Sequence, residues 1–254
     1  MTLEEFRRGH AVRSIDVNGV AWPCVDAGSG PCVVLLPGAQ GTAEIFHKQF
    51  ALAGRLRLVS VTYPAETDGA TLADGLAAFL DRLGIARASV AGTSLGGYVA
   101  QLFAARHPAR VDRLVLTCTF VDPGPVQAPD KLASARDTPA ETLKEQVLAR
   151  VRAAPASELR DIQLDLIGAK QDAALLRARM LAVQLAAPVP PLGLDQARIT
   201  VIDCDNDPVI PAPVRAAVRE RYPQAAAHNL AGGGHYPYIL CADEYNRLLA
   251  ARLA

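Results

Sequence analysis

The sequence predicts an α/β fold in which a mostly parallel central sheet is flanked by helices. Aliphatic runs such as residues 32–36 (CVVLL) contain no polar residue, which is typical of strands buried on both faces. These runs alternate along the chain with amphipathic helical patterns, as expected for strand–helix–strand units of a parallel sheet. A length of 254 residues, half of them hydrophobic, suffices for one large domain.

The N-terminal part of the chain is predicted to contain two turns. Asn18-Gly19 lies between apolar residues and predicts a β-hairpin, because both residue types tolerate the positive φ angles of a type I′ turn. Residues 28–31 (GSGP) predict a second turn, which leads into the strand at 32–36. Pro37-Gly38 ends that strand, and we expect a loop to follow it.

The following elements repeat the alternation of strand and helix. We expect further strands at 56–61, 88–91, 114–117 and 199–202, and helices at 71–83 and 98–106. The helix at 71–83 is amphipathic, because its large apolar residues share one stripe: Leu72, Leu76, Phe79, Leu80 and Leu83.

Residues 122–196 break this alternation, because they contain helical patterns but no strand pattern. The first helix is expected to begin at Thr138-Pro139-Ala140-Glu141, where threonine and glutamate can form a capping box and proline suits the first helical position. Two more helices are expected at 158–167 and 172–186.

This segment is too long to be a single crossover between neighbouring parallel strands. We therefore expect a helical cap at residues 122–196, inserted into an α/β core that consists of residues 1–121 and 197–254. Ordinary helices that cover the sheet are the alternative interpretation of the same pattern.

Composition and charge exclude several classes of function. Lys+Arg 26 balance Asp+Glu 26, so the chain lacks the concentrated positive field that captures nucleic acid or anionic lipid. No apolar run approaches the ~18 residues that span a bilayer, and the N-terminus MTLEEFRRGH lacks the apolar centre of a signal peptide. We expect a cytoplasmic protein that acts on a small molecule, with no nucleic-acid or membrane partner; a homodimer is compatible with the sequence.

The cysteines indicate neither a metal site nor a disulfide framework. Their spacing contains no CxxC pair or other ligand pattern, and their number is odd: Cys24, Cys32, Cys118, Cys204 and Cys241. A free thiol in an apolar run packs as a small core side chain. We therefore expect no metal and no cofactor.

The sharpest functional motif is Gly92-Thr93-Ser94-Leu95-Gly96, which matches G-x-S-x-G. The motif alone is weak, but here it follows a strand pattern and precedes a helix pattern. A sharp strand-to-helix turn lifts the serine hydroxyl out of the sheet at a helix N-terminus, where the helix dipole favours an anion. Ser94 is therefore the predicted nucleophile; a glycine-rich turn with an incidental serine is the alternative.

A serine nucleophile needs a base and an orienting carboxylate. His235 follows three glycines on a loop near the C-terminus, so it can approach another side chain; the other four histidines are expected to be structural. Asp207 lies on the loop after the strand at 199–202, which gives the chain order serine, aspartate, histidine. Three aspartates are rivals for the role of Asp207: Asp122, Asp203 and Asp205.

Backbone N–H groups are the expected donors to an oxyanion. Leu95 supplies one, directly after the nucleophile, and Ala39 supplies the other from the loop at 37–42. Aromatic and polar residues of the core are the candidates for substrate contacts: Gln40, Phe46, Tyr98 and Tyr236. Residues 121–221 contain no Phe, Trp or Tyr, so the predicted cap is aliphatic and favours an aliphatic substrate.

The combination of motifs resembles the α/β-hydrolase superfamily over nearly the whole chain. Four segments look like its landmarks: residues 25–31 (VDAGSGP), 92–96 (GTSLG), 207–211 (DPVIP) and 233–235 (GGH). Others are similar to a maspardin-like subgroup: Pro37, 41–43 (GTA), 63–64 (YP), 233–234 and 237–238 (PY). Many relatives carry histidine where Pro37 stands; proline cannot make the side-chain hydrogen bonds of that histidine, but the backbone donor of the loop is retained.

The resulting hypothesis is a serine hydrolase that cleaves a small aliphatic ester, thioester or lactone through an acyl-enzyme. Two alternatives use the same fold. One is a carbon–carbon bond hydrolase with the same triad. The other is a non-hydrolytic small-molecule receptor or protein-binding adaptor, as the maspardin resemblance implies, although maspardin lacks the complete triad that Ser94, Asp207 and His235 would form here.

Overall fold

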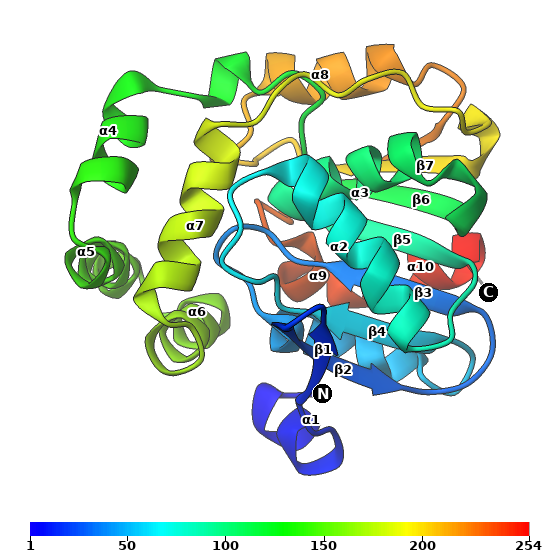
Figure 1. The fold of residues 1–254 in the computed structure, drawn as a ribbon, viewed down its shortest axis with the longest axis horizontal. Helices are drawn as coiled ribbons and strands as arrows, with labels where there is room; N and C mark the ends of the chain where they lie inside the picture. Colours follow the sequence, from blue (N-terminus) through cyan, green and yellow to red (C-terminus); the bar gives the residue numbers. More distant parts are fainter. Residues whose placement is uncertain (254) are drawn as a thin grey trace.

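A computed structural model describes residues 1–253 and contains one eight-stranded sheet (Figure 1). The strand order is β1-β2-β4-β3-β5-β6-β7-β8. Only β1 and β2 pair antiparallel to their neighbours, and the other pairings are parallel. The strands are β1 (Arg13–Val17), β2 (Val20–Ala27), β3 (Cys32–Leu36), β4 (Arg57–Val61), β5 (Ala88–Thr93), β6 (Val111–Thr117), β7 (Ile199–Asp203) and β8 (Ala226–Asn229).

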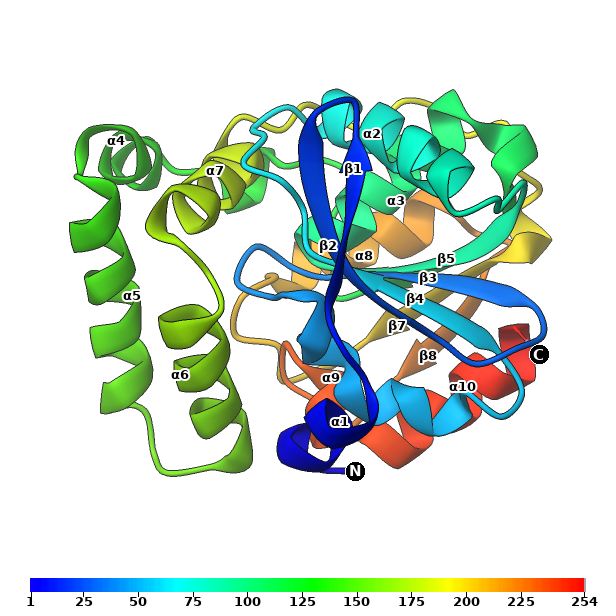
Figure 2. The same cartoon turned by 60° about the horizontal axis from the view of Figure 1, so that its bottom comes forward.

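Helices cover both faces of this sheet, as Figure 2 shows. One face is packed by α2 (Gly69–Arg82), α3 (Leu95–Arg106) and α8 (Ala212–Arg221). The other face is packed by α1 (Leu3–Gly9), the 3₁₀ segment η1 (Ala43–Leu52), α9 (Pro237–Leu240) and α10 (Ala242–Leu253). The α/β architecture with a mostly parallel sheet is therefore confirmed.

The short connections agree with their turn chemistry. Asn18 and Gly19 have φ angles of 55° and 82°, and Val17 pairs with Val20, so the predicted hairpin forms. Gly28 is also at positive φ, and a Cβ added there would lie 2.2 Å from the carbonyl oxygen of Leu56. Glycine is required at that turn because a side chain would collide with the backbone of a neighbouring segment.

Residues 122–196, called the cap segment below, contain four helices between β6 and β7 and project to one side of the sheet (Figure 1). These are α4 (Pro129–Asp137), α5 (Ala140–Ala153), α6 (Glu158–Ala169) and α7 (Ala173–Gln184). Helices α5, α6 and α7 bury a small apolar cluster of their own, made of Val147, Leu148, Ile167 and Leu176. The Tyr98 hydroxyl accepts a hydrogen bond from the Ala187 N–H (3.1 Å) and so ties the end of the segment to the core.

Two details of this segment differ from expectation. The predicted capping box is wrong: Thr138 ends α4, and Pro139 occupies the N-cap position of α5 without a side-chain hydrogen bond. Helix α4 was not predicted, because only Ala135 of its nine residues is buried and the sequence shows no apolar stripe there. Within residues 1–253, no helix is long and apolar enough to cross a bilayer.

Candidate active site

Ser94 occupies the turn between β5 and α3, with φ of 53° and ψ of −122°. Such left-handed angles cost a non-glycine residue roughly 1–3 kcal/mol, and the surrounding structure must hold them in place. The surroundings are tight, since Cβ atoms added at Gly92 and Gly96 would lie 2.2 Å and 2.1 Å from the carbonyl oxygens of Gly96 and Leu36. The glycines of the motif therefore allow the backbone approach that presents the serine.

We expect Gly96→Ala to destabilise the protein strongly, because its new methyl group would meet the backbone oxygen of Leu36 and not a movable side chain. A loss of roughly 3 kcal/mol or more in the free energy of unfolding is expected. Gly54→Ala is the matched control, since a Cβ at Gly54 meets nothing within 4 Å. Chemical denaturation measures both variants, and equal stability of the two would contradict the tight packing of this turn.

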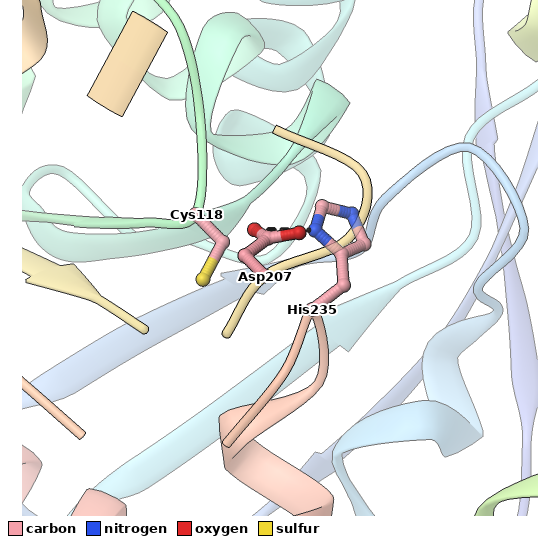
Figure 3. Close-up of side chains that lie close together, drawn as sticks. All are labelled: Cys118, Asp207 and His235. Carbon is pink, nitrogen blue, oxygen red and sulfur yellow. Dashed lines mark hydrogen bonds and ion pairs between the residues drawn. The ribbon is translucent and has the colours of Figure 1, made fainter. Parts of the chain in front are cut away.

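Asp207 and His235 form a buried pair on the loops that follow β7 and β8. The Nδ1 atom of His235 lies 3.0 Å from Oδ2 of Asp207, as the dashed line in Figure 3 shows. The other carboxylate oxygen, Oδ1, accepts the N–H groups of Val209 (2.7 Å) and Ile210 (3.1 Å). With Asp207 ionised, Nδ1 donates to it and Nε2 is left as a proton acceptor.

The electrostatics of this pair favour an ionised Asp207. Burial alone would raise the pKa of the Asp207 carboxyl group, but the hydrogen bond and charge of His235 and the two backbone donors outweigh it. The pKa of Asp207 is therefore lowered from its ordinary value. An ionised carboxylate at this position orients the imidazole and stabilises its protonated form.

The rival aspartates are engaged elsewhere. Asp203 forms an ion pair with Arg219. Asp205 accepts the N–H of its neighbour Asn206, and Asp122 accepts the N–H of Gly124 (2.9 Å). Of the four candidates, the structure brings Asp207 to His235.

Ser94 and His235 line the same cavity, which has a volume of about 650 Å³. Ser94 is half-buried, while His235 is buried. Among residues 1–253, no hydrogen bond joins the Ser94 hydroxyl to His235. Catalytic hydrogen bonds are often long in the absence of substrate and shorten in the complex, so a shared cavity is the relevant geometry here.

The two expected oxyanion donors belong to segments that meet at Ser94. Leu95 begins α3, and the first N–H groups of a helix have no partner within the helix. Ala39 lies in the loop at residues 37–42, called the oxyanion loop below, and also lines the cavity. The loop packs close to the serine, because a Cβ at Gly38 would lie 3.2 Å from the Ser94 Cβ.

The four expected substrate contacts divide into two pairs. Gln40 and Tyr236 line the cavity. Phe46 and Tyr98 do not: Phe46 is buried against Tyr238 (ring centroids 4.8 Å apart), and Tyr98 stacks on Phe120 (5.2 Å). Both are therefore placed in the packing around the cavity and not at its surface.

Several residues that line the cavity were not predicted from the sequence. The cap segment contributes Met180, Val183 and Gln184 from α7, which share one helical face at spacings of three and four residues. The spacing was visible in the sequence, but nothing in it shows which face of a helix lies over a site. Phe120 and Ile210 complete the apolar wall from the core.

A metal ion is one further chemical option for this site. One ligand atom each of Cys118, Asp207 and His235 lie within 4.8 Å of one another, and Figure 3 shows Asp207 between the other two. The neighbouring Cys204 side chain and burial raise the pKa of the Cys118 thiol far above its ordinary value, so it is protonated. An ion here would replace the proton between Asp207 and His235, so metal binding and base catalysis are alternatives at this position.

The remaining histidines lie outside the cavity. His10 stacks on Phe6, and His107 contacts Asp74 (2.8 Å). His47 is completely buried, and burial lowers its pKa to about 4, so it is a neutral core residue at neutral pH. These placements agree with the structural roles expected for them.

Comparison with known proteins identifies the family. Maspardin of Danio rerio is 28% identical over 249 residues, which cover 94% of this chain and 80% of maspardin. A 2-hydroxy-6-oxononadienedioate/2-hydroxy-6-oxononatrienedioate hydrolase of Burkholderia vietnamiensis is 40% identical over 108 residues, or 36% of this chain and 37% of that protein. The enol-lactonase structure from Burkholderia xenovorans has a TM-score of 0.77 at 19% identity and covers 95% of this chain and 99% of its own. Residues 33–248 match the family model, and the chain therefore belongs to the alpha/beta hydrolase family.

Proposed function

We propose that this protein is a serine hydrolase that cleaves a small aliphatic ester, thioester or lactone. One observation carries the proposal: Ser94, held at positive φ at the N-terminus of α3, shares a cavity with His235, whose Nδ1 is bonded to a buried Asp207. A nucleophile, a base and an orienting carboxylate in this relation are the parts that acyl transfer needs.

In the proposed reaction the Ser94 oxygen attacks the substrate carbonyl carbon while His235 Nε2 takes the hydroxyl proton. The negative charge that develops on the carbonyl oxygen is stabilised by the N–H groups of Leu95 and Ala39. His235 then donates its proton to the leaving oxygen or sulfur, and the acyl group stays on Ser94. A water molecule, deprotonated by His235, cleaves the acyl-enzyme and regenerates the hydroxyl.

The lining of the cavity supports an aliphatic acyl group. Phe120 and Tyr238 come from the core. The cap segment supplies aliphatic side chains, Val126, Met180 and Val183, beside the charged side chains of Asp130, Lys131 and Arg150. A volume of about 650 Å³ lies within the range of small-molecule sites. An aromatic acyl group would find no stacking partner on the cap side.

Carbon–carbon bond hydrolysis is a second candidate reaction, because a partial match is a dienedioate hydrolase. A non-hydrolytic binding protein is the third, favoured by the similarity to maspardin over 94% of the chain. Neither candidate needs a different arrangement of Ser94, Asp207 and His235.

A fluorophosphonate probe with intact-mass measurement tests the proposal. We expect one covalent adduct on the wild-type protein, located at Ser94 by peptide mapping, because the activated hydroxyl attacks phosphorus as it attacks a carbonyl. An unmodified protein after prolonged incubation would favour the binding role. Hydrolysis of vinylogous 1,5-diketones without hydrolysis of p-nitrophenyl butyrate would favour carbon–carbon cleavage.

A further inference from the structure

Arg179, on α7 of the cap segment, is a charged residue that is 0% exposed and has no carboxylate partner among residues 1–253. Its Nη1 donates to the carbonyl oxygen of Gly41, its Nε donates to Leu175 (3.4 Å) on its own helix, and its Nη2 has no partner. Burying an unpaired cation is costly. The cost of burying this charge suggests that Arg179 has a specific role, and its one hydrogen bond outside α7 is made to the oxyanion loop.

A second buried side chain of the cap segment contacts the same loop. Gln171, 2% exposed, donates from Nε2 to the carbonyl oxygen of Gln40 (2.5 Å). Lys144 on α5 donates to the Gln171 carbonyl oxygen (2.6 Å) and so supports it from within the cap segment. Two successive carbonyl groups of the oxyanion loop are therefore held by the cap segment.

The oxyanion loop makes few hydrogen bonds within itself. Its residues are Pro37, Gly38, Ala39, Gln40, Gly41 and Thr42, and the Thr42 side chain accepts a hydrogen bond from Glu44 in the following segment. One internal bond closes the turn, from the Gly41 N–H to the Gly38 oxygen (3.0 Å). The loop needs external contacts to fix the direction of its amide groups.

Peptide planarity connects these contacts to the Ala39 N–H. The Gln40 carbonyl and the Gly41 N–H belong to one rigid plane, and the Gly38 carbonyl and the Ala39 N–H belong to another. Gln171 orients the first plane, and the Gly41–Gly38 hydrogen bond passes that orientation to the second. Arg179 fixes the next carbonyl along, at Gly41.

We infer that Arg179 and Gln171 are positioning residues of the oxyanion hole, so that docking of the cap segment and formation of the hole are one structural event. The inference rests on the proposed hydrolase function for its kinetic consequence, but the contact itself is independent of turnover. Neither side chain reaches the reacting atoms; both act through the backbone of residues 38–41.

The test compares Arg179→Met and Gln171→Leu with Arg177→Met. Arg177 lies on the same helix, is half-buried, and donates to Ala135 and Arg136 inside the cap segment, so its removal leaves the oxyanion loop untouched. We expect kcat for p-nitrophenyl butyrate to fall about tenfold to a hundredfold in the first two variants with KM unchanged. Arg177→Met should keep the wild-type kcat, and Arg179→Lys should recover part of the loss.

Two further measurements separate positioning from a merely structural role. Amide hydrogen exchange of residues 37–43 should accelerate in Arg179→Met and Gln171→Leu but not in Arg177→Met. The melting temperature of Arg179→Met should not fall, because methionine removes an unpaired buried charge.

Two outcomes would overturn the inference. One is a wild-type kcat with unchanged hydrogen exchange in Arg179→Met and Gln171→Leu. The other is a parallel loss of melting temperature and kcat that Arg179→Lys does not recover. If the wild type hydrolyses no ester and takes no fluorophosphonate, the proposed function fails, while the exchange comparison still decides whether the cap segment holds the loop.

Discussion

Ser94→Ala should lower kcat for p-nitrophenyl butyrate by about 10⁶-fold, the size of the loss when a serine protease loses its nucleophile. Alanine keeps the Cβ of serine and adopts the same backbone angles, so the φ of 53° at the turn is retained. The hydroxyl that attacks the carbonyl is the only group removed. Steady-state kinetics together with circular dichroism measure the loss and verify the fold.

Ser89→Ala is the matched control for this prediction. Ser89 is a buried serine on the same strand, β5, and does not line the cavity. Its removal should leave kcat within about twofold of the wild type, the range of a substitution away from the site. Turnover by Ser94→Ala near the wild-type rate would show that another group performs the reaction.

The sheet could be predicted because its physical signals are local. Strand β3 coincides with the five-residue run CVVLL, and β4, β5, β6 and β7 were predicted within three residues of their ends, whereas β8 was not predicted. A strand buried on both faces must be apolar throughout, and the turn residues mark where it stops. Helices α1 and α4 were missed, because each buries a single side chain, Phe6 or Ala135, and such a helix carries no apolar stripe. Helices α8, α9 and α10 were not predicted either.

The part of the site that could be predicted is the part whose backbone geometry is set by one short segment of sequence. The turn at Ser94 requires glycines at fixed offsets, and the sequence contains them. Phe46 and Tyr98 are the opposite case. An aromatic side chain near the site can pack in the core behind the cavity or line the cavity itself, and the sequence does not distinguish these two positions. The contact between Arg179 and Gly41 joins residues distant in the chain, so it depends on how the cap segment docks.

Asp207→Asn should lower kcat by about 10⁴-fold, the size of the loss when the triad aspartate of a serine protease is replaced by asparagine. The structure supplies the reason. The N–H groups of Val209 and Ile210 both point at Oδ1 and will hold the single oxygen of the amide there. The amide NH₂ must then face His235 Nδ1, which stabilises the tautomer protonated at Nε2, and that tautomer cannot accept the proton of Ser94. Asp205→Asn and Asp122→Asn should keep most of the activity, since neither carboxylate contacts His235.

The pH dependence of kcat/KM tests whether the ionisation of Asp207 limits the reaction. Because the pKa of Asp207 is lowered below its ordinary value of 3.8, its carboxylate stays ionised well into acid, and any stability it contributes is lost only as pH falls through that lowered value. A fall in kcat/KM that sets in, as the pH is lowered, well above that acid range is therefore not caused by protonation of Asp207. A wild-type profile that stays flat to about pH 4 would exclude histidine as the base.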